Sequence, residues 1–334
     1  MKGSTYVRHC ISLLREHGLW LTALGTLLVF FGLFLFGDAN AVVKALSNVD
    51  AGAVVAMFCL VLVGYGIRFL KWAYYLRVLE ITIPVRQSAL VFFSGLMLVV
   101  TPGKVGEVWK AWFLRDLHDV PVSRTVPVVG AERVTDLLAL SSFAFLAVLL
   151  YQRSIVVLIG IVALLIGGLG VLQWRSLSLR ILSWLHTIPV LGPYASDLRD
   201  FYERTYELFR PRPLAVAMVL SLLAWGLEGI ALWVILRGFD APADPLLGLS
   251  VLGLGSVVGA VSFLPGGLGA AEASMVGTLL AVGYSRTVAV SATLLIRVGT
   301  LWYGAIIGAF VFGLYRLMDT SSERQTSFER ESND

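Results

Sequence analysis

The sequence predicts an all-α polytopic membrane protein built from two inverted copies of one unit, which is a span, a re-entrant Pro-Gly hairpin and a second span. Three observations lead to this fold class. The 334 residues are 57% hydrophobic and only 14% charged, whereas soluble domains carry about 25% charged residues. Several apolar stretches approach or exceed the roughly 20 residues that a helix needs to cross the hydrocarbon. Three sequence matches also recur in the same order at nearly one offset.

Apolar stretches of sufficient length define about six full spans. They are uniformly apolar, which excludes an outer-membrane barrel because the strands of a barrel alternate apolar and polar residues. Two further apolar stretches, 86–100 and 246–264, end in Pro-Gly clusters and are predicted to be the first arms of re-entrant hairpins. The full spans are predicted at 19–37, 53–79, 125–151, 155–173, 213–236 and 288–315.

The residues before the first span fit two interpretations. Lys2, Arg8 and Arg15 precede an apolar run, as they would in a cleaved signal peptide or in a retained anchor. The retained anchor is favoured because the run is longer than the core of a usual signal peptide.

The chain is predicted to form a single transmembrane domain, 1–318. Within it, the polar segment 174–212 contains a predicted interfacial amphipathic helix at 196–210, which has apolar residues on one side and charged residues elsewhere. The polar tail, 319–334, is predicted to be disordered.

The internal repeat is the most informative feature of the sequence. Three pairs of segments match, at offsets of 163 (101 to 264), 162 (123 to 285) and 164 (132 to 296) residues. Three matches in order define two copies of one unit, at about 53–151 and 213–317. The pairs are "TPGKVGEVWKAW" with "LPGGLGAAEASM", "SRTV" with an identical "SRTV", and "ERVTDLLAL" with "IRVGTLWYG".

The two copies are predicted to be inverted. An odd number of crossings separates them, because three spans intervene and a hairpin adds either none or two. The cluster of Arg68, Lys71, Arg77 and Arg86, together with the arginines of 174–212, is assigned to the cytoplasmic side by the positive-inside rule. Both termini are then cytoplasmic, the first hairpin opens to the cytoplasm, and the second opens to the outside. Inverted repeats of this kind are typical of transporters with a site near mid-membrane.

The hairpin breaks carry the first group of candidate site residues. Proline removes a backbone donor and glycine permits turns that other residues resist, so a break at membrane depth must be covered by protein or border a water-filled cavity. Helix N-termini at such breaks suit anions. The breaks are formed by Pro102, Gly103 and Gly106 in the first copy and by Pro265, Gly266, Gly267 and Gly269 in the second.

The second group consists of ionisable residues in apolar surroundings. A charge at the centre of a spanning helix costs about 2.5–3.5 kcal/mol on insertion scales, so these residues are expected to face the interior and to be paired. Arg133 is expected to pair with Glu107 or Asp136, and Arg297 with Glu272 or Glu228. Two interpretations stay open for each residue, a structural ion pair or the lining of a headgroup cavity. The candidates are Lys104, Glu107, Lys110, Glu132, Arg133, Asp136, Glu228, Glu272 and Arg297.

Other kinds of site are not predicted. The two cysteines and four histidines form no metal-binding spacing, no catalytic or nucleotide-binding motif is present, and no cofactor or nucleic-acid partner is expected. Gly253, Gly255 and Gly259 lie in no strand–helix context, so they are interpreted as close-packing positions rather than a dinucleotide motif.

Four segments together resemble the lysylphosphatidylglycerol synthase transmembrane region, a family that includes the flippase half of the multiple peptide resistance factor. The resemblance covers about 15–317 and implies a lipid-translocating domain with inverted repeats and re-entrant hairpins. It also implies that the candidate residues at the motif positions belong to its site. Two departures are that Lys104 stands where family members often have Arg, and that no synthase domain follows Asp319. The segments are "TPGKVGEVWKAWFLR", "ERVTDLLAL", "FLPGGLGAAEA" and "IRVGTLWYGAIIG".

The sequence therefore favours a lipid flippase-like transporter of the cytoplasmic (inner) membrane rather than an enzyme. Its substrate would be an anionic or aminoacylated phospholipid or a polyprenyl-phosphate-linked lipid, supplied by a lipid-modifying enzyme encoded separately. Proton coupling and passive scrambling stay open, as does the oligomeric state. The alternatives are a membrane glycosyltransferase or its accessory protein, and a carrier of small water-soluble ions.

Overall fold

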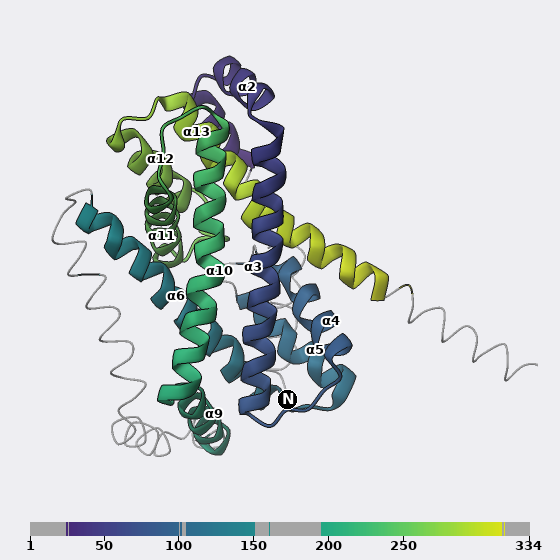
Figure 1. The fold of residues 1–334 in the computed structure, drawn as a ribbon. Helices are drawn as coiled ribbons and strands as arrows, with labels where there is room; N and C mark the ends of the chain where they lie inside the picture. Colours follow the sequence, from purple (N-terminus) through teal and green to yellow (C-terminus); the bar gives the residue numbers. More distant parts are fainter. Residues whose placement is uncertain are drawn as a thin grey trace, which may run out of the picture.

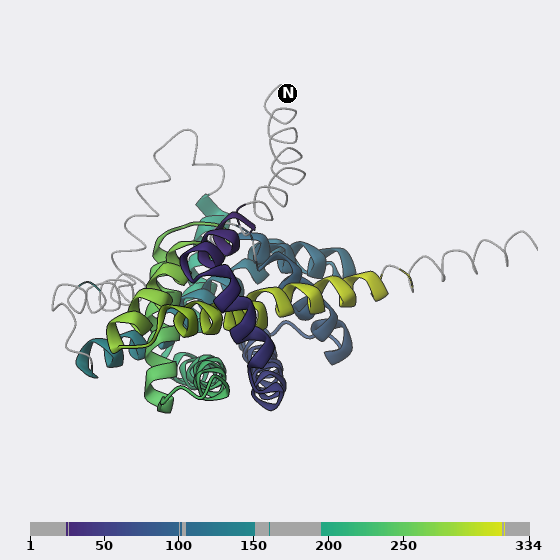
Figure 2. The same ribbon diagram turned by 90° about the horizontal axis from the view of Figure 1, so that it is seen from above.

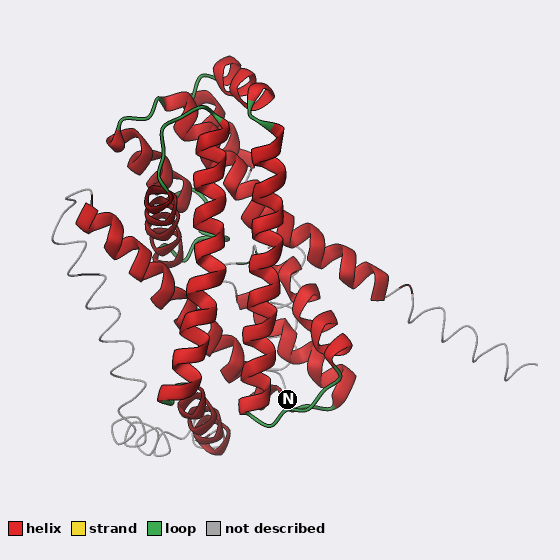
Figure 3. Cartoon of the chain, in the orientation of Figure 1, coloured by secondary structure: helices red, strands yellow, loops and turns green. Residues whose placement is uncertain are grey.

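The computed structural model describes residues 27–99, 101, 105–150 and 195–315, together with residues 25, 160 and 317. Within these residues the regular structure is helical (Figure 3). Three helices are long and apolar enough to cross a membrane, and a fourth span is added if the bent pair of Leu27–Phe36 and Ala39–Asn48 is counted as one. The predicted span at 155–173 and the tail 319–334 lie outside the described residues, apart from residue 160.

Two long helices, α3 (Ala51–Val78) and α10 (Pro211–Gly238), form the centre of the molecule (Figure 1). They are antiparallel, because the N–H of Asp50 before α3 donates to the carbonyl oxygen of Gly238 at the end of α10, at 3.0 Å. The Asp50 carboxylate also caps α3 by accepting from the N–H of Ala53. Pro211 begins α10, where its missing N–H costs nothing.

A helical hairpin follows each long helix. The first consists of α4 (Val85–Gly95), η1 (Leu96–Leu98), η2 (Val105–Val108) and α5 (Trp109–His118). The second consists of α11 (Pro245–Val261) and α12 (Ala270–Val282). In Figure 1 the first hairpin lies toward the end of the central pair where α3 finishes, and the second lies toward the end where α10 finishes.

Glycine is required at the break of the second hairpin. Gly267 has a φ of 67°, in the left-handed region, and a Cβ on it would lie 2.9 Å from the Cα of Gly259. The expected packing glycines of α11 are confirmed, since a Cβ on Gly253 would lie 2.6 Å from the Cβ of Phe143 in α6 (Val122–Leu150). A Cβ on Gly255 or Gly259 would collide with Met275 or Ala271 of α12.

Each half ends in a further long helix. The first is α6 (Val122–Leu150). The second is α13 (Arg286–Arg297), which continues through the π-helix η4 (Val298–Trp302) to Tyr315. Figure 2 shows α13 and its continuation running obliquely across the molecule. The order of long helix, hairpin and long helix is the same in both halves, and α3 and α10 run in opposite directions. An inverted repeat requires both features, and the repeat remains a prediction from the sequence.

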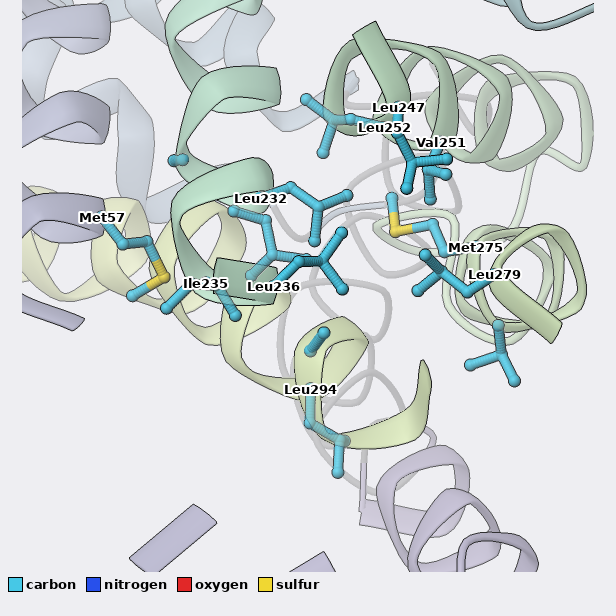
Figure 4. Packing of buried hydrophobic residues seen from close by; sticks show 14 of the residues in the cluster. Met57, Leu232, Ile235, Leu236, Leu247, Val251, Leu252, Met275, Leu279 and Leu294 are labelled. Atoms are coloured by element: carbon cyan, nitrogen blue, oxygen red, sulfur yellow. The ribbon is translucent and has the colours of Figure 1, made fainter. Parts of the chain in front are cut away.

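Two hydrophobic clusters hold these elements together. The larger one joins α3, α10, α11, α12 and α13, and residues such as Met57, Leu232, Val251, Met275 and Leu294 pack in it (Figure 4). The second lies around α4, α5 and the end of α3, and it includes Trp72, Phe92 and Leu114.

Two peripheral helices complete the described structure. The predicted amphipathic helix is confirmed as a helix, α9 (Ala195–Leu208), and Leu208 and Phe209 at its end are buried in the second cluster. The segment 38–52, which lies between two predicted spans, contains α2 (Ala39–Asn48), and the Asp38 carboxylate caps this helix. The axis of α2 is bent by 97° from the helix before it.

Candidate functional site

A cavity of about 250 Å³ lies between the two hairpins and the long helices. Its walls come from both halves of the chain, including the break of the second hairpin and the beginning of α5. Of the described residues, nine charged ones line it, which are Arg68, Lys71, Glu107, Lys110, Glu132, Arg133, Asp136, Glu228 and Arg297. The polar surface that the sequence predicts between the hairpins is therefore present as one continuous site.

Lys71 and Asp136 form a buried pair at one end of the site. The Lys71 Nζ lies 2.5 Å from the Asp136 Oδ1 and also donates to the Ser221 Oγ at 2.8 Å. The Ser221 hydroxyl donates to the same carboxylate oxygen at 3.1 Å. This contact joins α3, α6 and α10, so it ties both halves of the chain together.

The pair belongs to a larger network of alternating charges. Lys110 binds Glu132 at 2.8 Å and Glu107 at 3.3 Å, and its ammonium lies over the rings of Trp72 and Phe92. Arg133 binds Glu107 at 3.2 Å and Asp136 at 3.1 Å. Three cations and three carboxylates therefore balance one another, which is what burial of charges in an apolar environment requires.

Arg68 and Glu228 form a separate pair between α3 and α10. The Arg68 Nη2 lies 2.6 Å from the Glu228 Oε1. The guanidinium also lies 4.1 Å from the centre of the Trp225 ring, a distance typical of a cation–π contact. The ion pair and the aromatic ring together fix the position of this guanidinium in the wall of the cavity.

Arg297 holds the break of the second hairpin in place. Its Nε lies 2.5 Å from the Glu272 Oε1, and its Nη2 donates to the carbonyl oxygen of Gly266 at 2.6 Å. The other oxygen of Glu272 accepts from the N–H of Gly269 at 2.6 Å. A break between two helices leaves backbone groups that need partners, and Arg297 and Glu272 supply partners for Gly266 and Gly269.

Among the described residues that line the cavity, the most exposed charged side chains are cationic. The side chain of Arg133 is 29% exposed and that of Arg68 is 12% exposed. The carboxylates to which they are paired, Glu107, Asp136 and Glu228, are at most 6% exposed. The acidic groups therefore lie behind the arginines, and a ligand that enters the cavity meets guanidinium groups first.

The mouth of the cavity is apolar. Phe263 and Leu264, in the break of the second hairpin, line the cavity and are exposed, Phe263 to 77%. Phe263 has a φ of 54°, which a bulky residue adopts only under strain. Strained residues gather at functional sites, and an exposed aromatic ring here suits contact with lipid chains better than contact with water.

Several predicted residues lie where the sequence places them. Arg133 binds both predicted partners, and of the two partners proposed for Arg297 the structure selects Glu272. Glu228 binds Arg68 instead. Glu132 and Lys110 bind each other.

The first break is described only in part. Gly106 lies in η2, whereas Pro102, Gly103 and Lys104 lie outside the described residues. In the second break, Pro265 and Gly266 lie between α11 and α12, beside Gly267 and Gly269. Whether any of the predicted site residues binds a ligand stays a prediction.

The sequence assigns Arg68 and Lys71 to the cytoplasmic side, and the structure adds that both line the cavity. Both lie within α3, and Lys71 is fully buried in its network. The sequence analysis did not place them in the cavity, because a cation near the end of an apolar stretch also fits the positive-inside rule. One signal could have revealed them: the two residues are three apart and so lie on one helix face, and this face also carries Tyr65.

Comparisons with known proteins give a consistent result. The family model described as the lysylphosphatidylglycerol synthase TM region matches residues 20–308. A UPF0104 membrane protein of Methanothermobacter thermautotrophicus is 25% identical over 310 residues, 87% of this chain and 91% of the relative. A UPF0104 membrane protein of Pyrococcus horikoshii is 24% identical over 285 residues, 77% of this chain and 84% of the relative. The residues that the family model matches, 20–308, include both hairpins and every lining residue of the cavity.

Proposed function

The chain belongs to the lysylphosphatidylglycerol synthase transmembrane-region family, and we propose that it is a flippase-like transporter of phosphate-bearing lipids. The headgroup passes through the cavity between the hairpins while the tails remain in the bilayer. The substrate is an anionic or aminoacylated phospholipid or a polyprenyl-phosphate-linked lipid, and a separate lipid-modifying enzyme supplies it. The membrane is the cytoplasmic membrane, with both termini on the inner side.

The observation that carries this proposal is the contrast between the interior and the mouth of one cavity. Among the described residues of the interior, Arg133 and Arg68 are the two most exposed charged side chains, and the mouth presents Phe263 and Leu264. A small hydrated ion would gain nothing from an apolar mouth. An amphiphile with a phosphate group and long chains matches both parts.

The mechanism we propose is alternating access by rocking of one repeat against the other. Lys71 and Asp136 both contact Ser221 of α10, and Arg68 of α3 binds Glu228 of α10. Because these contacts join helices of different halves, such a movement must break or rearrange contacts that the ligand could replace. The driving force is either proton coupling through the acidic residues or the lipid gradient alone.

Reconstitution tests this proposal. Liposomes that contain the purified protein and a trace of fluorescent phosphatidylglycerol are treated with a quencher that cannot cross the bilayer. We expect the protein to expose the inner-leaflet label faster than empty liposomes do. If the label in the inner leaflet stays protected as it is in empty liposomes, with either direction of a pH gradient, the proposal is wrong.

A further inference from the structure

The arginines of the cavity differ in how many of their donors are already used. One edge of a guanidinium carries Nε and Nη2, and this edge can hold two oxygens at once. In Arg297 both donors are occupied, by Glu272 and by the carbonyl oxygen of Gly266. In Arg68 and Arg133 only Nη2 is paired with carboxylates. Within the part of the chain that the structure describes, the Nε of each is buried without an acceptor.

A buried donor without an acceptor is uncommon and calls for an explanation. Leaving such a group unpaired costs free energy that a hydrogen bond would recover. Arg68 comes from α3 and Arg133 from α6, and both line the same cavity. They lie close enough to interact electrostatically with each other and with Asp136. Two guanidinium groups on one cavity repel each other, and an anion between them would remove the repulsion and satisfy the free donors.

The surroundings fix the two groups as a receptor rather than as mobile charges. Arg68 is held by Glu228 on one side and by the Trp225 ring, and Arg133 is held by Glu107 and Asp136. The carboxylates lie behind the arginines and are nearly inaccessible, so they hold the cations without closing the cavity. This arrangement leaves the guanidinium groups accessible to an entering ligand.

We propose that Arg68 and Arg133 together form a phosphate subsite, in which oxygens of a phosphate monoester or diester accept from the two Nε–H groups. Arg297 takes no part in binding and only holds the hairpin break. The lipid origin of the phosphate rests on the proposed function, whereas the subsite itself does not. Free phosphate has the same chemistry, and the experiment separates the two sources.

Binding of fluorescent phosphatidylglycerol to the purified protein in detergent tests the subsite, with fluorescent diacylglycerol of the same chains as the probe without phosphate. We expect Arg68→Lys and Arg133→Lys to raise the Kd for phosphatidylglycerol about tenfold or more, because lysine keeps the charge but loses the two-donor edge. Binding of the diacylglycerol should not change. Exposed arginines of the same helices provide matched controls, Arg77→Gln in α3 and Arg124→Gln in α6, and both should bind as the wild type does.

A second variant guards against misfolding. Arg68→Gln alone leaves Glu228 as a buried charge without its arginine, so Arg68→Gln/Glu228→Gln removes the pair together. We expect it to unfold near the temperature of the wild type and still to bind phosphatidylglycerol about tenfold more weakly. The subsite is refuted if the lysine variants and this double variant bind with wild-type affinity. It is also refuted if the diacylglycerol loses affinity to the same extent.

Inorganic phosphate as a competitor identifies the source. Competition at millimolar concentration that disappears in Arg133→Lys supports the subsite with free phosphate as a sufficient ligand. Failure to compete, together with arginine-dependent binding of phosphatidylglycerol, supports the subsite with a lipid as its ligand. Binding that depends on the arginines but is accompanied by no lipid movement in liposomes would refute the proposed transport and leave the subsite intact.

Discussion

The pair of Arg297 and Glu272 gives the most definite prediction about stability. Glu272 is fully buried, and its two oxygens bind the Arg297 Nε at 2.5 Å and the N–H of Gly269 at 2.6 Å. Glu272→Gln keeps the size of the side chain but leaves the Arg297 guanidinium buried without its counter-ion. Breaking a buried pair from one side costs about 3–5 kcal/mol.

Thermal unfolding of the purified protein in detergent measures this cost. A loss of this size corresponds to a Tm lowered by roughly 4–7 °C in a chain of 334 residues. Glu80→Gln, at an exposed carboxylate after α3, is the matched control and should unfold at the same temperature as the wild type. Glu272→Gln/Arg297→Met should recover part of the loss, because removing both charges leaves no unpaired ion.

Two outcomes would refute this reasoning. If Glu272→Gln unfolds at the temperature of Glu80→Gln, the pair does not hold the break of the second hairpin. If the double variant is less stable than Glu272→Gln by the full cost of a second disruption, the two residues act independently, and the geometry of the pair has no energetic consequence.

Two further predictions concern contacts between helices. Gly248→Ala should lower the Tm because a Cβ there would meet the carbonyl oxygen of Gly229 in α10. The expected cost is about 1–3 kcal/mol of stability. The control is Gly66→Ala, where a Cβ has no neighbour within 4 Å, and it should not lower the Tm. The Tyr65 hydroxyl donates to the carbonyl oxygen of Thr300 in η4 at 2.7 Å. Tyr65→Phe removes this bond and should therefore speed amide hydrogen exchange in η4 but not in α10. Unchanged exchange in η4 would show that this bond does not stabilise the π-helix.

Local signals made much of the fold predictable. The first arm of the second hairpin, expected at 246–264, is α11 at Pro245–Val261. This agreement was possible because proline and glycine mark helix ends within a few residues. The pairing of Arg133 with Asp136 could also be predicted, since residues three apart share a helix face. In both cases the deciding interaction lies within one element or at its end.

The rest depended on contacts between distant segments. Arg68 meets Glu228 and Lys71 meets Asp136 across 160 and 65 residues of sequence. The shared helix face of Arg68 and Lys71 is the one local signal that they line a cavity. Their partners lie on other helices, so the pairs that fix these two cations could not be assigned from the sequence.

The most direct test of transport through the cavity is to block it and measure lipid movement in liposomes. Ser256 lies in α11 and lines the cavity, whereas Leu62 lies on an exposed face of α3. Ser256→Trp fills the cavity, and Leu62→Trp adds the same ring outside it. We predict that fluorescent phosphatidylglycerol moves no faster with Ser256→Trp than in empty liposomes, while Leu62→Trp moves it at the wild-type rate. Movement at the wild-type rate in both variants would contradict passage of the headgroup through this cavity.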